Sequence, residues 1–266
     1  MTPLETIALN TLYFGGEGHP PLVILHGLLG SARNWRTVAG DLSSRFEVFA
    51  VDLRGHGDSP HHPDIDYDLM EADLLAWLDA RRLEKVVLVG HSMGGKLAMR
   101  FACDHPDRVR ALVVVDIAPK DYPAMRLEFD AMNAIDLAAC ASRPEVEERL
   151  GDWIRDWGMR KFLLTNLERE PDGGLHWRVD LPALTRALPA LSANPLSAYH
   201  HYAAGPVLFV RGERSGFIAD ADAEAIEYHF PGYAMAIIPD CGHNPHHEKR
   251  ESFVRVLTDY FRERLA

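Results

Sequence analysis

The chain has 266 residues, of which 47% are hydrophobic and 25% are charged, and its formal net charge at pH 7 is −11 with histidines counted as neutral. This length and composition predict a globular protein with a large buried core and exclude a disordered or low-complexity chain. The negative charge argues against non-specific binding to nucleic acid or to an anionic membrane.

The cysteines, the first residues and the apolar runs indicate the cellular compartment of the protein. Cys103, Cys140 and Cys241 are widely spaced and odd in number, which indicates a reducing compartment rather than a disulfide framework. The first residues show no basic segment followed by an apolar run, so we expect no signal peptide. No apolar run reaches the length of a membrane span. These features predict a cytoplasmic, soluble protein without stable membrane association.

Strands and helices alternate in the first part of the chain. One or two opening strands are expected between residues 4 and 14, and apolar runs or helical spacing predict the elements that follow. The expected strands are 22–25, 46–51, 86–89 and 111–115, and the expected helices are 34–42, 67–82 and a segment after residue 92. This alternation predicts an α/β fold with a doubly wound, mostly parallel sheet, whose functional groups lie at the carboxyl ends of the strands.

The alternation stops near residue 120 and resumes near residue 203. Helical patterns without a convincing strand occupy the intervening segment, at 125–139, 144–157 and 182–191. Strand, helix, strand and helix then follow at 206–210, 221–230, 234–238 and 251–265. We therefore expect residues 1–119 and 203–266 to form the core, and residues 120–202 to form an inserted helical cap.

The segment Gly90-His91-Ser92-Met93-Gly94 lies between an expected strand and an expected helix. Gly-x-Ser-x-Gly in that context is typical of a nucleophile elbow, a sharp turn that presents the serine hydroxyl above a sheet. Glycine at both ends lets the strand and helix backbones approach closely. The helix begins at the serine, so the N–H of Met93 points to where an oxyanion would develop. Ser92 is the predicted nucleophile.

The glycine- and histidine-rich loops also partly match two other kinds of site, a phosphate-binding loop and a zinc site. Gly90, Gly95 and Lys96 match the start of a phosphate-binding loop, but Leu97 stands where that motif needs Ser or Thr to hold magnesium. The three histidines of the 243–247 loop fit no usual zinc spacing, and no cysteine is positioned to complete such a motif. We therefore expect no metal.

Loops after two further strands complete the chemistry that a serine nucleophile requires. The His-Gly loop after strand 22–25 can direct the N–H of Leu28 into the same space as that of Met93, and two such donors form an oxyanion hole. A serine hydroxyl also needs a base, and His243 lies in a Gly/Pro-rich loop after the last strand. The polar loop 52–59 is predicted to be a structural turn.

Four motifs, in the order found here, resemble those of the α/β-hydrolases: 26–31, 52–59, 90–96 and Gly242-His243. The resemblance covers the whole chain except the expected cap, where it is only architectural. Lys96 and the following Leu-Ala-Met resemble the YbfF-type esterases in particular. That resemblance implies activity on short acyl esters, with acyl-CoA-like thioesters as substrates of some members. Because a serine esterase needs no cofactor, none is expected.

The acid that orients His243 departs from the usual α/β-hydrolase pattern. Ser215 stands where most members carry an aspartate after the strand that is here 206–210. In YbfF-type esterases the acid lies one strand earlier and a serine occupies the vacant position, which matches Asp116 and Ser215. From the residues alone, a carboxylate at a strand end beside the elbow strand can reach the same histidine. We favour Asp116 as the acid, ahead of Glu213 and then Asp240.

Together these features predict a serine carboxylesterase that hydrolyses short- to medium-chain acyl esters through an acyl-enzyme on Ser92. The expected partner is a small-molecule acyl ester. Because the fold hosts many chemistries, a cofactor-free lyase or C–C hydrolase is the alternative. A non-catalytic binding module is a weaker one, suggested by the serine at position 215. Relatives with dehalogenase or epoxide hydrolase chemistry carry aspartate at the nucleophile position, which disfavours those reactions.

Overall fold

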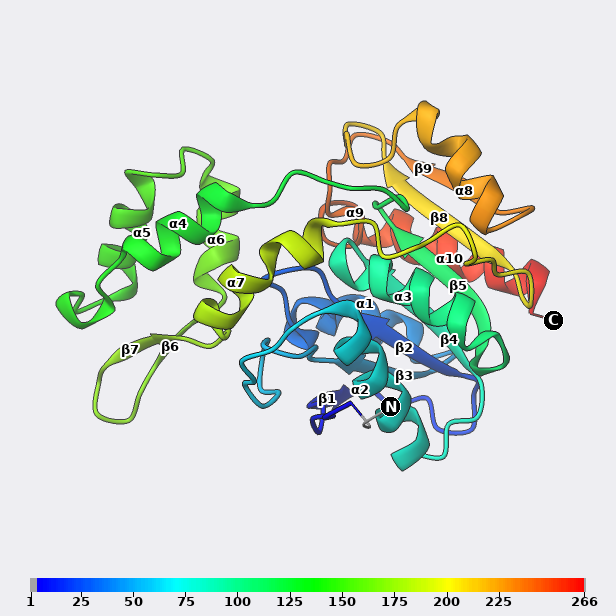
Figure 1. The fold of residues 1–266 in the computed structure, drawn as a ribbon, viewed down its shortest axis with the longest axis horizontal. Coiled ribbons are helices and arrows are strands. Elements are labelled where there is room, and N and C mark those ends of the chain that lie inside the picture. The colour runs from blue at the N-terminus through cyan, green and yellow to red at the C-terminus, as the bar shows by residue number, and fades with distance from the viewer. Residues whose placement is uncertain (1–3, 266) are drawn as a thin grey trace.

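The computed structural model describes residues 4–265 and contains a seven-stranded sheet in the order β1-β3-β2-β4-β5-β8-β9 (Figure 1). β1 is antiparallel to β3, and all other neighbouring pairs in this sheet are parallel. The strands are β1 (Thr11–Tyr13), β2 (Pro21–Leu25), β3 (Glu47–Val51), β4 (Val86–His91), β5 (Val109–Val115), β8 (Val207–Gly212) and β9 (Ala234–Ile238). The predicted α/β-hydrolase architecture is confirmed.

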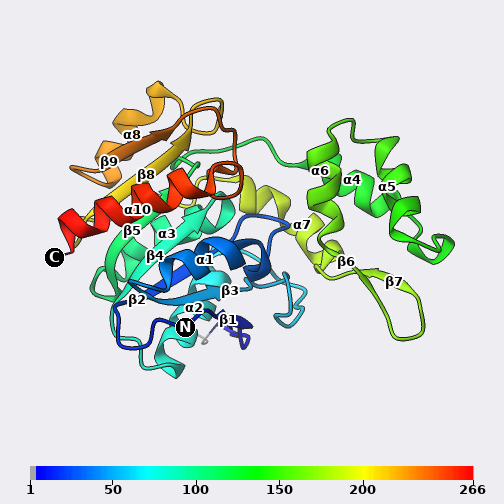
Figure 2. The ribbon, with the colours of Figure 1, turned by 180° about the vertical axis from the view of Figure 1, so that it is seen from behind.

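Helices cover both faces of the sheet because side chains alternate along each buried strand. Helices α2 and α3 cover one face and α1 and α10 cover the other (Figure 2). On β4, Val86 and Leu88 pack with the first pair of helices, whereas Val87 and Val89 pack with the second pair. These helices and their neighbours are α1 (Arg36–Leu42), α2 (Tyr67–Ala80), α3 (Met93–Asp104), α8 (Ala223–His229), α9 (Pro245–Glu248) and α10 (Arg250–Arg264). No helix within residues 4–265 is long and apolar enough to cross a membrane.

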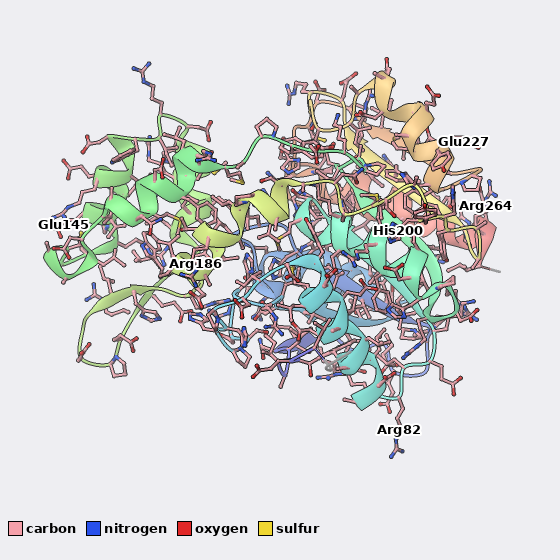
Figure 3. All side chains as sticks on the ribbon, viewed as in Figure 1. Arg82, Glu145, Arg186, His200, Glu227 and Arg264 are labelled. Atoms are coloured by element: carbon pink, nitrogen blue, oxygen red, sulfur yellow. The ribbon has the colours of Figure 1, made fainter. Side chains whose placement is uncertain are left out.

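The elements between β5 and β8 lie to one side of the sheet (Figure 1). They are α4 (Arg126–Ala134), α5 (Arg143–Gly151), α6 (Trp157–Leu164), β6 (Leu167–Arg169), β7 (Leu175–Trp177) and α7 (Leu181–Ser192). Charged side chains such as Arg82, Glu145 and Glu227 project from the surface of both parts (Figure 3).

The expectation of no strand in residues 121–201 is wrong, because β6 and β7 form an antiparallel hairpin. Each strand has only three residues, which is too short for an alternating pattern to show. The turn between them contains Gly173 at φ +95°, and the Asp172 side chain accepts a hydrogen bond from Gly174 N at 2.9 Å. This is ordinary turn chemistry for Asp and Gly.

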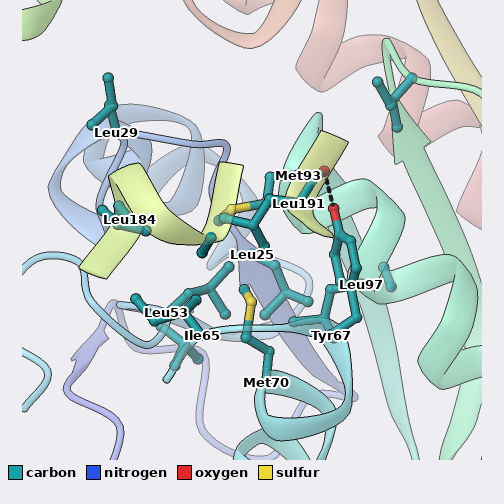
Figure 4. Packing of buried hydrophobic residues seen from close by; sticks show 14 of the residues in the cluster. Leu25, Leu29, Leu53, Ile65, Tyr67, Met70, Met93, Leu97, Leu184 and Leu191 are labelled. Carbon is teal, nitrogen blue, oxygen red and sulfur yellow. Dashed lines mark hydrogen bonds between the residues drawn. The ribbon is translucent and has the colours of Figure 1, made fainter. Parts of the chain in front are cut away.

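Lys96 of α3 holds the end of α7 against the sheet domain. Its buried Nζ donates to the carbonyls of Ser192 at 2.7 Å and Ala193 at 2.8 Å. The last carbonyls of a helix have no intrahelical partner, and a cation near them is favourable. Tyr67 adds a bond from its hydroxyl to the carbonyl of Leu191 at 3.0 Å (Figure 4). Burial lowers the pKa of Lys96 to about 8.

The turn from β4 to α3 depends on close backbone contact. A Cβ at Gly90 would lie 2.2 Å from the carbonyl oxygen of Gly94, and one at Gly94 would lie 2.5 Å from that of Leu25. Ser92 adopts φ 50° and ψ −117°, outside the regions that L-residues prefer. The two glycines therefore allow a strained turn to pack against the neighbouring strand.

We predict that Gly90→Ala lowers the free energy of unfolding by about 3 kcal/mol, because the atoms that it meets are backbone and cannot move aside independently. Gly40→Ala is the matched control. Gly40 is an exposed residue of α1 with no neighbour within 4 Å of its Cβ position, so alanine should stabilise the protein by about 1 kcal/mol. Urea unfolding midpoints measure both changes, and an equal effect of the two substitutions would contradict the prediction.

Candidate active site

Ser92 lies at the carboxyl end of β4, half-buried, in the strained turn described above. Its N–H donates to the carbonyl of Val115 at 3.1 Å, which ties the turn to the end of β5. A Cβ at Gly27 would lie 3.3 Å from the Cβ of Ser92, so the loop after β2 packs directly against the serine. Strained residues held by their surroundings are frequent at functional sites.

His243 and Asp116 are in direct contact although 127 residues separate them. The distance from His243 Nδ1 to Asp116 Oδ2 is 2.8 Å. Gly212 N donates to the other carboxylate oxygen at 3.0 Å, and the hydroxyl of Ser215 donates to Oδ2. Asp116 is fully buried, and these three donors compensate for the removal of its carboxylate from water. Since a carboxylate only accepts, Nδ1 carries the shared proton and Nε2 is left as an acceptor.

The two alternative acids lie elsewhere. The Glu213 side chain is exposed and accepts a hydrogen bond from the backbone N–H of Asp240 at 3.0 Å. The Asp240 side chain is also exposed and lies 3.9 Å from Arg214. Of these carboxylates, Asp116 is therefore the one that the structure brings to His243.

Two contacts that the sequence did not indicate orient the His243 ring. Phe217 stacks on it, with ring centroids 3.6 Å apart and an angle of 17° between the planes. His91 Nε2 donates to the backbone carbonyl of His243 at 2.8 Å. His91 occupies the variable position of the Gly-x-Ser-x-Gly motif, so the turn that carries Ser92 is bonded to the loop that carries His243.

The loop after β2 directs one backbone N–H outwards. The carbonyl of Gly27 accepts hydrogen bonds from His26 Nδ1 at 2.8 Å and from Gly30 N at 2.9 Å. In a trans peptide the carbonyl and the following N–H point in opposite directions, so the N–H of Leu28 points away from the interior of this loop. Within residues 4–265, the N–H groups of Leu28 and Met93 both lack an intramolecular acceptor.

Ser92, His243 and Leu28 line one cavity of about 670 Å³. The segment between β5 and β8 supplies its apolar wall, which includes Met125, Trp157 and Phe162. This volume falls within the range of small-molecule sites. The structure therefore places a strained serine, a histidine paired with a buried carboxylate and an outward backbone donor around a single partly apolar space.

The charged side chains that line the cavity include two carboxylates and one lysine. The carboxylate of Asp156 accepts from Met159 N, and that of Glu248 accepts from Gly242 N and Asn244 N. The single lysine of the lining, Lys161, pairs with Glu147. No arginine of the described chain lines this cavity. Among the described residues, the lining thus offers no unpaired lysine or arginine to an anionic group.

Three buried histidines of the cavity lining are neutral. Burial lowers the pKa of His26 and His91, and lowers that of His246 to about 3. His246 stacks on Trp35 with ring centroids 4.1 Å apart. In the part of the chain that the structure covers, no group of three or more His, Cys, Asp or Glu side chains is arranged to hold a metal ion.

Asp52 and His56 of the polar loop 52–59 support the backbone around the site. Asp52 accepts hydrogen bonds from the N–H groups of Ala32 at 2.7 Å and Asp58 at 2.9 Å, and His56 Nε2 accepts from Leu29 N at 3.1 Å. Both side chains are buried. Their contacts agree with the predicted structural turn.

Comparison with known proteins places the chain among enzymes of this architecture. A family model described as the alpha/beta hydrolase fold matches residues 20–149. The sn-1-specific diacylglycerol lipase ABHD11 of Danio rerio is 36% identical over 98% of this chain and 84% of that protein. Esterase YbfF of Escherichia coli is 32% identical over 93% of this chain and 95% of that protein. A solved marine microorganism esterase has a TM-score of 0.91 and 34% identity, and covers 96% of this chain and 99% of that chain.

We predict that Asp116→Asn lowers kcat/KM for an ester by about 10²–10⁴-fold, because an amide cannot hold the His243 ring in its donating tautomer and stabilise its charged form. Ser215→Ala should cost about tenfold, since it removes one donor to the same carboxylate. Steady-state kinetics of purified variants measure both values.

Glu213→Gln is the matched control. Its side chain is exposed and lies outside the cavity, so kcat/KM should stay within about twofold of the wild type. A larger loss in Glu213→Gln than in Asp116→Asn would reverse the assignment of the acid.

Proposed function

The chain belongs to the α/β-hydrolase family, and we propose that it hydrolyses neutral short- to medium-chain acyl esters through an acyl-enzyme on Ser92. Its family and its similarity to named esterases make it an ester-hydrolysing serine hydrolase. We propose in addition that an acyl-enzyme forms, that the named residues have the roles given below and that the acyl chains are short to medium in length. The observation that carries it is the contact between His243 and the buried Asp116 in the cavity that Ser92 also lines.

In the proposed mechanism, His243 Nε2 takes the proton of the Ser92 hydroxyl as Oγ attacks the ester carbonyl carbon. The Oγ–C bond forms and the carbonyl π electrons move to oxygen, which becomes an oxyanion. Collapse expels the alcohol, which receives the proton from His243. Water then attacks the acyl-enzyme with His243 again as the base, which releases the acid and restores Ser92. Asp116 stabilises the ring while it carries the additional proton.

The N–H groups of Leu28 and Met93 are the proposed donors to the oxyanion. Both are free of intramolecular acceptors, and Met93 begins α3, where the helix dipole favours negative charge. Backbone donors that are already in place stabilise developing charge without reorganisation. No cofactor takes part in this sequence of steps.

The lining of the cavity supports a neutral substrate. Its two carboxylates are negative and its one lysine is paired, so an anionic group would enter without a free lysine or arginine as partner. The apolar wall formed by Met125, Trp157 and Phe162 suits an acyl chain.

We further propose that residues 120–202 act as the cap that supplies this wall. A cytoplasmic location stays a prediction.

The first test is hydrolysis of p-nitrophenyl esters from acetate to dodecanoate, with Ser92→Ala as the blank. We expect a maximum at short or medium chains and loss of activity by about 10⁴-fold or more in the blank, because the nucleophile is absent. A fluorophosphonate probe should label the wild type and not the blank. Labelling without hydrolysis of any ester would contradict the esterase proposal and favour the lyase or C–C hydrolase alternative; absence of labelling would favour a binding module.

The charged groups of the cavity lining predict a preference for neutral over anionic esters. The p-nitrophenyl esters of butyrate and of succinate have similar lengths, but the succinate monoester ends in a carboxylate. We expect kcat/KM for the succinate ester to be about 100-fold lower, because its charge would be buried without a partner. Equal values for the two esters would contradict the proposed preference for neutral substrates.

A further inference from the structure

The peptide units on either side of Leu29 are held by two distant parts of the chain. Leu29 directly follows the proposed oxyanion donor Leu28 and adopts φ +59°, in the left-handed region that non-glycine residues rarely occupy. Its N–H donates to His56 Nε2 at 3.1 Å, and its carbonyl accepts from Asn166 Nδ2 at 2.8 Å. An unfavourable backbone conformation persists only where its surroundings hold it.

The contact on the core side has a fixed proton arrangement. His56 Nδ1 lies 2.9 Å from the carbonyl of Arg54, and a carbonyl only accepts, so Nδ1 carries the proton and Nε2 is free to accept from Leu29. Burial lowers the pKa of His56 to about 3, which keeps the ring neutral and this arrangement unchanged at neutral pH.

The contact on the other side comes from the hairpin between β5 and β8. Asn166 directly precedes β6, and its carbonyl accepts from Arg178 N, just after β7, at 2.7 Å. Its side chain is only 2% exposed and reaches across 137 residues of sequence to the loop after β2. The base of the hairpin and the loop beside Ser92 are therefore joined by a buried hydrogen bond.

Four charged side chains also connect the same two parts of the chain. Glu168 and Arg178 of the hairpin alternate with Arg33 and Asp58 of the core. The distances are 2.7 Å for Arg33–Glu168, 3.1 Å for Arg178–Glu168, 3.1 Å for Arg33–Asp58 and 3.6 Å for Arg178–Asp58. Partly exposed ion pairs are weak singly, but a closed set of alternating charges restrains the hairpin at this point.

We propose that Asn166 is a positioning residue for the oxyanion hole, and that the hairpin holds the Leu28 N–H in its productive direction through the carbonyl of Leu29. This inference rests on the proposed function. Without the Asn166 donor, the buried Leu29 carbonyl has lost its partner, and the left-handed residue is held only from the core side, by His56 and by the bonds to the Gly27 carbonyl within the loop. The loop then relaxes, and the Leu28 N–H moves away from the oxyanion. Small misplacements of such donors are costly to the transition state.

The test compares Asn166→Ala and Glu168→Gln with Arg186→Ala as the control. Asn166→Ala removes the donor, whereas Glu168→Gln loosens the charged set at a partly exposed position and leaves the buried packing intact. Arg186, labelled in Figure 3, also joins the α7 segment to the core by donating to the carbonyl of Pro63 at 3.1 Å. Within residues 4–265, its side chain forms no hydrogen bond or ion pair with the hairpin base or with the loop after β2.

For each protein, active sites are titrated with a fluorophosphonate so that kcat and KM refer to intact sites only. The inhibition constant of an alkyl trifluoromethyl ketone is measured on the same samples. In its adduct the Ser92 Oγ–C bond forms, the ketone oxygen becomes an oxyanion and the proton passes to His243. Binding of this ketone therefore reports on the oxyanion donors, whereas the ester KM does not.

We expect Asn166→Ala to lower kcat by about 30-fold, to raise the ketone inhibition constant in parallel and to leave KM within about twofold. Glu168→Gln should change kcat and the ketone inhibition constant in the same directions by about threefold, and Arg186→Ala should change neither.

Unchanged kcat per titrated site and unchanged ketone binding in Asn166→Ala, with only a lower melting temperature, would overturn the proposal. If that variant yields no titratable sites, wild-type values for Glu168→Gln would also overturn it. A wild type that fails to react with the fluorophosphonate would instead refute the proposed function.

Discussion

The carboxylate of Asp116 has to be satisfied by hydrogen bonds because it is fully removed from water, and the three groups that satisfy it come from separate parts of the chain. Gly212 and Ser215 lie at the end of β8, and His243 follows β9. These bonds join the carboxyl ends of β5, β8 and β9 and set the orientation of the His243 ring. Phe217 and His91 then restrain that ring from its face and through its backbone carbonyl. The geometry beside Ser92 is a consequence of this one buried charge.

A second set of buried polar groups governs the loop on the other side of the serine. His26 and His56 are neutral, and each donates from Nδ1 to a backbone carbonyl and accepts at Nε2 from a backbone N–H. As neutral side chains they hold the backbone of this loop by hydrogen bonds, and they do not act as bases. Asn166 extends the same support from outside the core, so the segment between β5 and β8 both lines the cavity and contacts the backbone around it.

Much of this arrangement could be predicted from local patterns. The apolar run at 86–89 followed by Gly-x-Ser-x-Gly predicted a strand, a sharp turn and a helix, and β4 and α3 lie there. Strand ends meet at one edge of a parallel sheet, which is why residues far apart in sequence were expected around one site. The β6–β7 hairpin was missed because three-residue strands carry no periodicity. Asn166 and Phe217 were missed because a single amide or aromatic side chain in a connection has no pattern to mark its contact.

The sequence by itself determined the α/β fold class, the turn at Ser92 and the order of the candidate residues along the chain, because side-chain periodicity and glycine placement act over a few neighbouring residues. Only the tertiary structure decided which carboxylate lies beside His243. Asp116, Glu213 and Asp240 all follow strands. Asp116 follows β5, which lies between β4 and β8 in the sheet, and its side chain points inwards to His243. Glu213 instead contacts the backbone of Asp240 at the surface. Contacts of this kind depend on strand order and on the direction of single side chains, which no local pattern of residues specifies.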